Sequence, residues 1–550
     1  MESLSVMETY EKWNIQELPL SAPSIRRKVV GFLGSNGLRL EDVDLYMAVL
    51  DASGNILAGG GLSKDIIKCI AVAPEVRSEG LTAPLVSRLI AEASARGFHN
   101  LKVFTKPENT SVFESLGFRL LAKAPQAVLM ENGRGVDAYC SYLSGLRQPG
   151  RCGVIVMNAN PFTLGHQYLI TKALEEVQHL FVLPVREDVS LFPYAERLAM
   201  IRSGVAAFGS QVTVAEGSAY CISAATFPTY FLKDLSDSSE TQMRLDIDLF
   251  IRHIGPALGS DIRFVGTEPH DPLTARYNAL LQELMPGHIK EIPRLESVSA
   301  TRVRQALAEG DYARAASMTP ATTHPCLLSM LADRALRLEL DTPLKPGLVG
   351  PDGPGAHSDM DYILMGKGIS AIRPFFPQMA VADTSDELRR LGIDAESAML
   401  AATGGVNTHR GAIFALGLAL NAFGRKKDIG AVARELIGNT DDKGARAMAS
   451  SGYTALFEDW LPYYRSIKGQ PYDLQRTLLR IMSTLDDTCV LHRVGAERAR
   501  AVRDEARELC GAFSPEALQA LCRRYAQERI SPGGAADMLA LTIFIDSLIH

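Results

Sequence analysis

An apolar run that ends in a polar turn occupies residues 153–166, which read GVIVMNANPFTLGH. The run has the length and composition of a buried parallel strand, and its T-x-G-H ending is typical of a helix start. A strand that passes directly into a helix predicts an open α/β sheet, which binds ligands at the carboxyl ends of its strands. At that edge we expect Asn158, Thr163, Gly165 and His166.

A second cluster, rich in hydroxyl and guanidinium groups, lies at residues 299–304, which read SATRVR. Such groups bind phosphate oxygens, and helix-start amides with an imidazole stabilise the charge that grows during in-line displacement. The two clusters predict a nucleotidyltransferase that acts on the α-phosphate of ATP. Catalytic roles are predicted for His166, Thr163 and Arg304, and nucleotide binding for Asn158, Gly165, Ser299, Thr301 and Arg302. The alternatives are a packing histidine and a plain capped helix start.

Bulk composition narrows the class of protein. The net charge of −6 argues against a chain that works mainly by non-specific nucleic-acid binding. The first residues lack the pattern of a signal peptide, and the longest apolar stretch, 411–424, is too short to span a bilayer. Eight cysteines without a C-x-x-C pair indicate neither a zinc site nor a disulfide framework. We therefore expect a cytoplasmic protein without membrane or nucleic-acid partners.

The 550 residues divide into three successive regions with different patterns of predicted strands and helices, which predicts a multidomain protein. Residues 1–148 mix short strands with helices, and residues 149–322 alternate strands with helices in the manner of a Rossmann-like parallel sheet. Residues 323–550 lose the β-branched alternation and predict an all-helical domain. Pro-containing polar stretches at 145–151 and 319–325 mark the expected boundaries.

The N-terminal part contains a predicted strand at residues 66–72, a loop with Arg77, Gly80 and Thr82, and a helix. Free amides at such a helix start favour a pyrophosphate. The order resembles the GNAT acyltransferase fold, and the resemblance implies that Arg77 and Gly80 bind the pyrophosphate of a CoA-like ligand. The family usually has glycine or alanine where this chain has Thr82. An active N-acetyltransferase and a GNAT-like domain that only binds the CoA-like arm are both open.

The first 310 residues resemble citrate lyase ligase through several specific stretches in the expected order. Among them are GVIVMNANPFTLGHQYLITKAL, RFVGTEPHDPLTARYNALLQELMP and VSATRVRQAL. The resemblance implies that ATP and acetate give acetyl-AMP and pyrophosphate. The acetyl group then passes to the prosthetic-group thiol on the acyl carrier protein of citrate lyase. Arg197, Glu268, Tyr277 and Asn278 are secondary candidates, whose alternative role is ordinary hydrogen bonding within the fold.

Glycine turns, basic groups and carboxylates recur through the predicted helical domain. Such groups suit a Mg²⁺–triphosphate site, because Mg²⁺ prefers a few carboxylates together with phosphate oxygens. Candidates for ligand binding are Lys345, His357, Thr403, Gly404, Gly405, Asn407, His409, Arg410, Gly533 and Gly534. Candidate metal ligands are Asp359, Asp361, Asp486 and Asp487. The alternatives are helix caps for the acids and tight turns for the glycines.

This domain resembles triphosphoribosyl-dephospho-CoA synthase through GAHSDMD, TGGVNTHRGAIF and SPGGAADMLA. The resemblance implies that the 2′-hydroxyl of dephospho-CoA is joined to C1′ of the ATP ribose with release of adenine. Glu339, Asp359 and Asp361 are the predicted catalytic carboxylates. The family usually has an acidic residue directly after PGLV, whereas this chain has Gly350, and Asp352 is the candidate substitute.

Together these patterns predict a bifunctional enzyme that uses ATP, Mg²⁺, acetate and dephospho-CoA. Two alternatives stay open at this point. One is a carrier-protein-binding scaffold whose catalytic domains have partly decayed, which Gly350 and Thr82 favour. The other is a GNAT acetyltransferase fused to a general cofactor nucleotidyltransferase.

Overall fold

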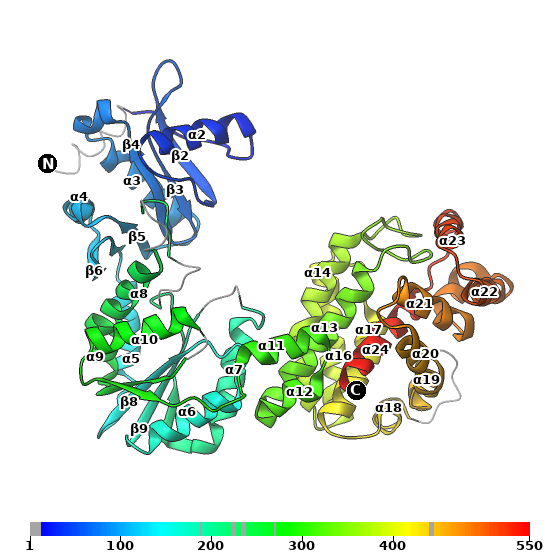
Figure 1. Cartoon of the computed structure of the whole chain (residues 1–550). Coiled ribbons are helices and arrows are strands. Elements are labelled where there is room, and N and C mark those ends of the chain that lie inside the picture. The colour runs from blue at the N-terminus through cyan, green and yellow to red at the C-terminus, as the bar shows by residue number, and fades with distance from the viewer. Residues whose placement is uncertain are drawn as a thin grey trace. The chain divides into compact units, whose positions relative to one another are not determined.

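The structure is a computed structural model that describes residues 13–186, 190–221, 227–232, 238–268, 271–438 and 445–549. The chain forms two compact units (Figure 1). The first unit comprises Met1–Asn160 and Gly165–Glu296, and the second comprises Pro161–Leu164 and Ser297–His550. The three-domain division with boundaries at residues 148 and 322 stays a prediction.

The first unit begins with a seven-stranded mixed sheet in the order β1-β2-β3-β4-β5-β7-β6. Its strands are β1 (Ile15–Glu17), β2 (Leu45–Leu50), β3 (Ile56–Ser63), β4 (Ile66–Val72), β5 (Leu101–Thr105), β6 (Arg119–Lys123) and β7 (Val128–Asn132). β4 and β5 pair in parallel, and every other pair is antiparallel. The predicted strand at 66–72 is therefore confirmed.

Helices cover both faces of this mixed sheet. α3 (Thr82–Ala95) packs Leu85, Val86 and Leu89 against strand residues on one face. α2 (Pro23–Ser35) packs Val29 and Leu33 on the other face, where α5 (Gly135–Ser144) also contributes Val136. This second core continues into the next sheet of the same unit through Val154 and Phe181. The two sheets of the first unit thus share one apolar core.

The second sheet of the first unit has five parallel strands in the order β10-β9-β8-β11-β12. Its strands are β8 (Cys152–Met157), β9 (His179–Pro184), β10 (Val212–Val214), β11 (Ile262–Gly266) and β12 (Ile289–Ile292). Figure 1 shows these strands flanked by helices, which include α6 (Leu164–Leu174), α7 (Tyr194–Val205), α8 (Ser238–Leu249) and α10 (Pro272–Leu284). The parallel sheet predicted from the alternation of strands and helices is confirmed.

In the second unit, every element assigned to the described residues from 300 onward is a helix, apart from one isolated bridge between Gly350 and Gly353. The longer ones are α11 (Ala300–Glu309), α13 (His324–Asp341), α14 (Tyr362–Ile372), α16 (Ser385–Ala402), α17 (Arg410–Gly424), α21 (Asp473–Thr484), α22 (Thr488–Gly511), α23 (Pro515–Gln527) and α24 (Gly533–Leu548). The apolar helix α24 contacts α13, α17 and α21, because a helix that is apolar all round is stable only when it is buried. The helical structure predicted for the C-terminal region is confirmed.

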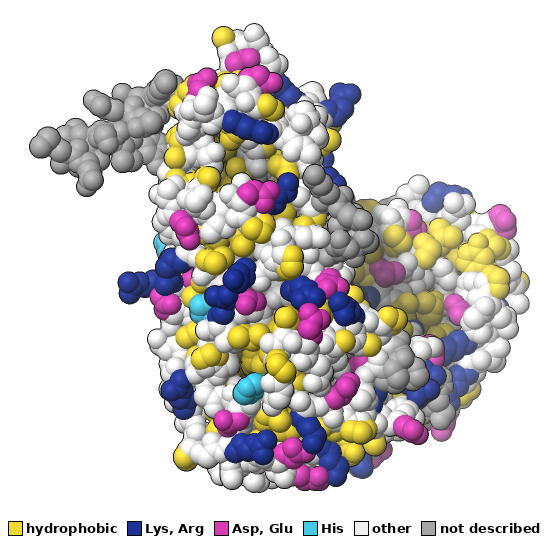
Figure 2. Space-filling model, turned by 60° about the vertical axis from the view of Figure 1, so that its left-hand side comes forward, with side chains coloured by type: hydrophobic (Ala, Val, Ile, Leu, Met, Phe, Trp, Pro, Cys, Tyr) yellow, Lys and Arg dark blue, Asp and Glu magenta, His cyan; other side chains and the backbone are white. Residues whose placement is uncertain are grey.

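Two surface properties bear on the expected partners. Within the described part of the chain, none of the helices has both the length and the apolar character that a bilayer crossing requires. On the face shown in Figure 2, basic and acidic side chains are interspersed rather than gathered into one basic stripe. Such mixing is typical of an ordinary solvated surface.

Candidate functional sites

Arg197 fixes the loop that follows the central strand β8. Its guanidinium is fully buried, and Nη1 donates hydrogen bonds to the Asn158 side-chain oxygen at 2.7 Å and to the carbonyl oxygen of Val185 at 2.8 Å. Nε donates to the carbonyl oxygen of Phe192 at 3.0 Å. Arg197 therefore holds the loop after β8 against the loop after β9, and it acts as a positioning residue rather than as an exposed ligand.

His166 lies in the first turn of α6, at the carboxyl edge of the parallel sheet. Burial, with a smaller contribution from the positive charge of Arg294, lowers the pKa of His166 to about 4. The imidazole is therefore neutral at neutral pH, and it can donate a hydrogen bond without bringing a positive charge. Gly165 and Asn158 belong to the same unit as His166.

The SATRVR cluster forms the start of α11 in the second unit, which also includes Thr163. Ser299 is the N-cap, and its hydroxyl accepts a hydrogen bond from the Arg302 backbone N–H at 3.0 Å. Nη2 of Arg304 donates to the Thr301 hydroxyl at 3.0 Å. A capped helix start is thus present, and the exposed Thr301 and Arg302 side chains leave phosphate binding open as a proposal.

The secondary candidates on α10 and nearby form hydrogen bonds within the fold. The Tyr277 hydroxyl donates to Asp246 at 2.5 Å and accepts from Nη2 of Arg263 at 2.8 Å. The Asn278 amide donates to the carbonyl oxygen of Gly266 at 2.9 Å. Glu268 forms an ion pair with Arg294. These contacts match the structural alternative that the sequence left open.

The loop that resembles a CoA-binding turn follows β4. Gly80 adopts a left-handed backbone conformation with φ of 73°, which favours glycine there. Arg77 turns back toward the sheet, where Nε donates to the carbonyl oxygen of Val72 at 3.4 Å and Nη2 donates to Asn36 at 3.4 Å. Thr82 is the first residue of α3. A ligand role for Arg77 and Gly80 stays a prediction.

A buried ion pair anchors the candidate site of the second unit. Nζ of Lys345 donates to a Glu339 carboxylate oxygen at 2.5 Å and to the Glu339 carbonyl oxygen at 2.6 Å. Both side chains are buried. This pair links the loop after α13 to the last turn of that helix. The sequence predicted Glu339 as a catalytic carboxylate and Lys345 as a ligand-binding residue.

The turn TGGVNTHR leads into α17. Gly404 and Gly405 have φ of 65° and 91°, so the turn requires glycine at both positions. The Asn407 side-chain oxygen accepts from the Arg410 backbone N–H at 3.1 Å, and Nε of Arg410 donates to Glu396 at 2.6 Å. The Thr403 hydroxyl donates to the carbonyl oxygen of Val406 at 2.6 Å. The tip of the turn is exposed.

His409 ends the same turn and is buried. Burial, followed by the positive charge of Lys345, lowers the pKa of His409 to about 3. Its Nδ1 lies 2.9 Å from the Thr408 hydroxyl. His409 is therefore neutral at neutral pH, and the cation that lowers its pKa is Lys345 of the buried ion pair.

Asp537 of α24 is a candidate that the sequence reasoning missed. Burial raises the pKa of its carboxyl well above the usual value, and the charges of Asp487 and Glu339 raise it further. The side chain lies against the start of α17, because a Cβ atom added at Gly411 would be 2.0 Å from an Asp537 carboxylate oxygen. The side chain keeps partial exposure. Its sequence signal is weak, because Asp537 is one of two acidic residues, with Asp546, in a largely apolar helix.

Asp487 joins two helix starts. One carboxylate oxygen accepts from the backbone N–H groups of Cys489 at 2.8 Å and Val490 at 3.3 Å, and the other accepts from Ala535 at 2.9 Å. Gly534 allows this approach, because an added Cβ atom would lie 3.0 Å from the carboxylate. Asp487 therefore caps α22 and α24. Its pKa is raised by burial.

Asp361 and Asp486 also have partners within the protein. Asp361 caps α14 by accepting from the Leu364 N–H at 2.8 Å, and Asp486 forms an ion pair with Arg503. Asp359 is exposed and lies 3.7 Å from Nδ1 of His357. Over the described part of the chain, no three His, Cys, Asp or Glu side chains are grouped to hold a metal ion. The four predicted metal ligands thus form no preassembled protein-only site.

His357 and Asp352 lie in the segment between α13 and α14. Nε2 of His357 is 2.8 Å from the Ser531 hydroxyl, and burial lowers the pKa of His357. A Cβ atom added at Gly350 would lie 2.8 Å from a carboxylate oxygen of Asp352. The Asp352 carboxylate therefore lies beside the space into which a side chain at position 350 would extend, and its role as a substitute stays a prediction.

Comparison with known proteins assigns the two parts of the chain separately. The model of the citrate lyase ligase C-terminal domain matches residues 152–327. The model of ATP:dephospho-CoA triphosphoribosyl transferase matches residues 327–449 and 438–550.

The relatives include the [Citrate [pro-3S]-lyase] ligase of Haemophilus influenzae, which is 41% identical over 53% of this chain and 92% of its own. The enzyme of the same name from Klebsiella pneumoniae is 39% identical over 56% of this chain and 93% of its own. A protein of Stutzerimonas stutzeri, named "Probable 2-(5''-triphosphoribosyl)-3'-dephosphocoenzyme-A synthase", is 38% identical over 40% of this chain and 91% of its own. The chain therefore belongs to the citrate lyase ligase family in its first part and to the triphosphoribosyl-dephospho-CoA synthase family in its last part.

Proposed function

We propose that this chain activates citrate lyase and also makes the precursor of its prosthetic group. The observation that carries the proposal is that successive stretches of one chain match the two family models. The chain also covers 92% of a citrate lyase ligase and 91% of a probable triphosphoribosyl-dephospho-CoA synthase. We call residues 1–326 the ligase part and residues 327–550 the synthase part. The two activities serve the same thiol-bearing arm.

In the ligase part, an acetate oxygen attacks the α-phosphate of ATP and pyrophosphate leaves. The acceptor thiolate then attacks the acetyl carbonyl carbon, and AMP leaves. The neutral His166 donates a hydrogen bond to the charge that develops on the phosphate, and Asn158, held by Arg197, positions the substrate. Thr163, Ser299, Thr301, Arg302 and Arg304 bind phosphate oxygens, and Gly165 permits close approach.

In the synthase part, the 2′-hydroxyl oxygen of dephospho-CoA bonds to C1′ of the ATP ribose as the bond from C1′ to adenine breaks. Such a displacement passes through an oxocarbenium-like centre, which needs a base at the hydroxyl and an acid at the leaving base. Asp537 is the acid, because burial raises the pKa of its carboxyl and so favours the protonated form that an acid requires. The carboxylate of Glu339, Asp359 or Asp361 is the base.

Anion binding in the synthase part falls to groups in the loop after α13 and at the start of α17. Cationic or hydrogen-bonding groups for the triphosphate come from Lys345, His357 and Arg410. Lys345 contacts Glu339, His357 contacts Ser531, and Arg410 contacts Glu396. Mg²⁺, when bound, would neutralise charge on the triphosphate, and one or two of the exposed carboxylates would hold it. Asp359 is the best placed of these because it has no cap or strong ion pair.

The acceptor of the acetyl group is the prosthetic-group thiol on the acyl carrier protein of citrate lyase, and the site of action is the cytoplasm. An assay of the His166→Ala variant tests the ligase part. Loss of hydrogen bonding to the transition state predicts a fall of about 10²-fold or more in acetate-dependent AMP formation. Dephospho-CoA-dependent adenine release by the same variant serves as the internal control for folding. Near-normal AMP formation by the variant would remove His166 from the mechanism. Absence of acetate-dependent AMP formation by the unaltered chain would contradict the ligase assignment.

A further inference from the structure

A pocket of about 410 Å³ lies between the two sheets of the first unit. On one side are Asp65 and Lys102, at the amino ends of β4 and β5. On the other side are Arg186 and the segment 216–220, which follow the carboxyl ends of β9 and β10. The volume falls in the range of small-molecule sites, and the edge formed by β9 and β10 is the one that binds ligands in parallel sheets.

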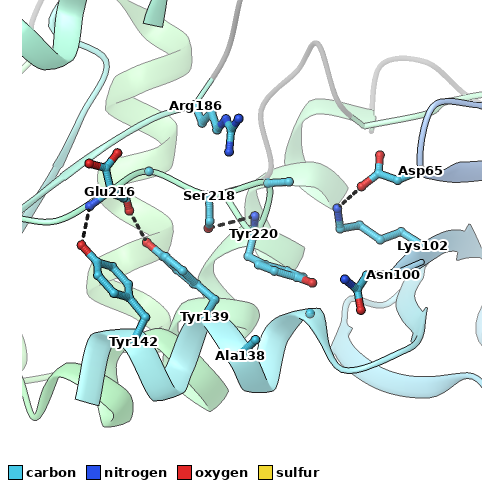
Figure 3. Close-up of a pocket in the computed structure, with 13 residues that line it drawn as sticks. Asp65, Asn100, Lys102, Ala138, Tyr139, Tyr142, Arg186, Glu216, Ser218 and Tyr220 are labelled. Atoms are coloured by element: carbon cyan, nitrogen blue, oxygen red, sulfur yellow. Dashed lines mark hydrogen bonds and ion pairs between the residues drawn. The ribbon is translucent and has the colours of Figure 1, made fainter. Parts of the chain in front are cut away.

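The pocket carries positive charge at two places. Nζ of Lys102 is buried, donates to Asp65 at 2.6 Å and lies 5.0 Å from the ring centroid of Tyr220. Arg186 extends from the loop after β9 and, among the described residues, forms no ion pair (Figure 3). Because Asp65 already neutralises Lys102, Arg186 is the cation that remains for an anionic ligand. A guanidinium binds phosphate oxygens at two points.

The remaining wall is flat and rich in aromatic rings. The ring centroids of Tyr139 and Tyr220 are 6.1 Å apart with an angle of 25° between the planes, and Tyr142 stacks on Tyr139 at the same distance. Figure 3 shows Tyr139 and Tyr142 rising from α5 toward Glu216. Their hydroxyls bond to the Glu216 carbonyl oxygen and N–H, so the rings are fixed in place. Such a wall suits a flexible chain with alternating apolar and amide groups.

The pocket also adjoins the edge where the adenylate forms. Arg197 binds both Asn158 and the carbonyl oxygen of Val185, which is the residue before Arg186. A ligand whose phosphate rests on Arg186 therefore extends along the same edge as Asn158. In the second reaction step, the acceptor thiol must reach the acetyl adenylate from a site that the nucleotide does not occupy.

We propose that this pocket binds the acceptor arm of the ligase part, a chain of amide groups with a thiol at one end and a phosphate at the other. This inference rests on the proposed ligase activity, and it places the arm away from the loop with Arg77 and Gly80. Arg186 binds the phosphate, and the tyrosine wall holds the chain.

Two variants of the full chain test this site with defined probes. Ala138 lies on the exposed face of α5 and lines the pocket, so Ala138→Trp fills the space without removing a core contact. Arg186→Ala removes the phosphate partner. Calorimetry measures the binding of 4′-phosphopantetheine and of pantetheine, which lacks the phosphate. The matched controls are Ala95→Trp and Arg96→Ala, which change exposed residues at the end of α3.

Loss of a charge-assisted hydrogen bond predicts that Arg186→Ala weakens binding of 4′-phosphopantetheine by about tenfold, with little change for pantetheine. Ala138→Trp is expected to weaken both probes by at least about tenfold, because it removes the contact surface itself. Unchanged binding in Ala138→Trp, absence of binding to the unaltered chain, or weakening by Arg77→Ala instead would overturn the inference. Acetate-dependent exchange of pyrophosphate into ATP is measured in parallel. Its absence contradicts the proposed function, whereas its persistence with unchanged probe binding contradicts the pocket alone.

Discussion

Lys345 donates a hydrogen bond to the Glu339 carboxylate at 2.5 Å, and both side chains are buried. Glu339 lies in the last turn of α13, and Lys345 lies in the loop that follows this helix. The Glu339 charge raises the pKa of Asp537, and the Lys345 charge lowers the pKa of His409. The pair thus acts electrostatically on both the candidate acid and the neighbouring imidazole.

Removing one partner of this pair leaves an uncompensated buried charge. We expect Lys345→Met to lower the free energy of unfolding of the second unit by about 3–5 kcal/mol. Urea unfolding followed by circular dichroism measures the change, with the exposed Lys367→Met as the matched control. The double variant Glu339→Leu with Lys345→Met is expected to regain most of the stability without regaining adenine release. Equal stability of Lys345→Met and the control would show that the pair is solvated in solution.

Asp537→Asn removes the proposed acid while it keeps the size of the side chain. General acid catalysis contributes about 10²–10⁴-fold, so we expect adenine release to fall within that range. Burial raises the pKa of Asp537 and favours its protonated form, so we expect the rate to fall as pH rises through that pKa. A pH–rate profile measures this alkaline limb, and Asp394→Asn on the exposed face of α16 is the control. An unchanged rate and profile in Asp537→Asn would exclude the acid role.

Gly411 is required by the close approach of Asp537. A methyl group at this position would overlap an Asp537 carboxylate oxygen at 2.0 Å. We expect Gly411→Ala to reduce dephospho-CoA-dependent adenine release by about tenfold or more, because a displacement of about 1 Å disturbs catalysis strongly. Acetate-dependent AMP formation is expected to stay normal. Gly366→Ala on α14, where an added Cβ meets nothing within 4 Å, is the control. Full adenine release by Gly411→Ala would place Asp537 outside the mechanism.

His409 makes the stability of the second unit depend on pH. Folding lowers its pKa from 6.5 to about 3, so the unfolded chain binds a proton in this range and the folded chain does not. Stability from this group is complete above pH 6.5 and falls as pH drops toward 3, by up to about 1.4 kcal/mol per pH unit. Unfolding curves between these pH values measure the slope. His409→Gln is expected to flatten it, and an identical slope would contradict the burial of a neutral imidazole.

The sequence predicted the elements better than it predicted the roles of individual side chains. The strand at 66–72, the alternating strands and helices after residue 149 and the helices after residue 323 were recognisable because period and composition are local properties. Asp537 was missed because its pKa depends on Glu339 and Asp487, which are distant in the sequence.

The reliance on local patterns also explains why helix-capping acids were predicted to be metal ligands. Asp361 and Asp487 cap helices, and a cap is set by local backbone geometry that a D-rich motif does not distinguish from a ligand. Arg197 was placed among secondary binding candidates, whereas its full burial and its contacts with Asn158 and Val185 come from the packing of two loops. Tertiary contacts of this kind are not encoded in any short window.

Adenine release tests the central claim most directly. The purified chain is incubated with ATP, Mg²⁺ and dephospho-CoA, and the bases and nucleotides are separated by chromatography. A parallel sample contains ATP, acetate and a reduced citrate lyase carrier thiol. We expect free adenine that depends on dephospho-CoA in the first sample and AMP that depends on acetate in the second. AMP without adenine would contradict the account, because the synthase part, with Gly350 beside Asp352, would then be inactive.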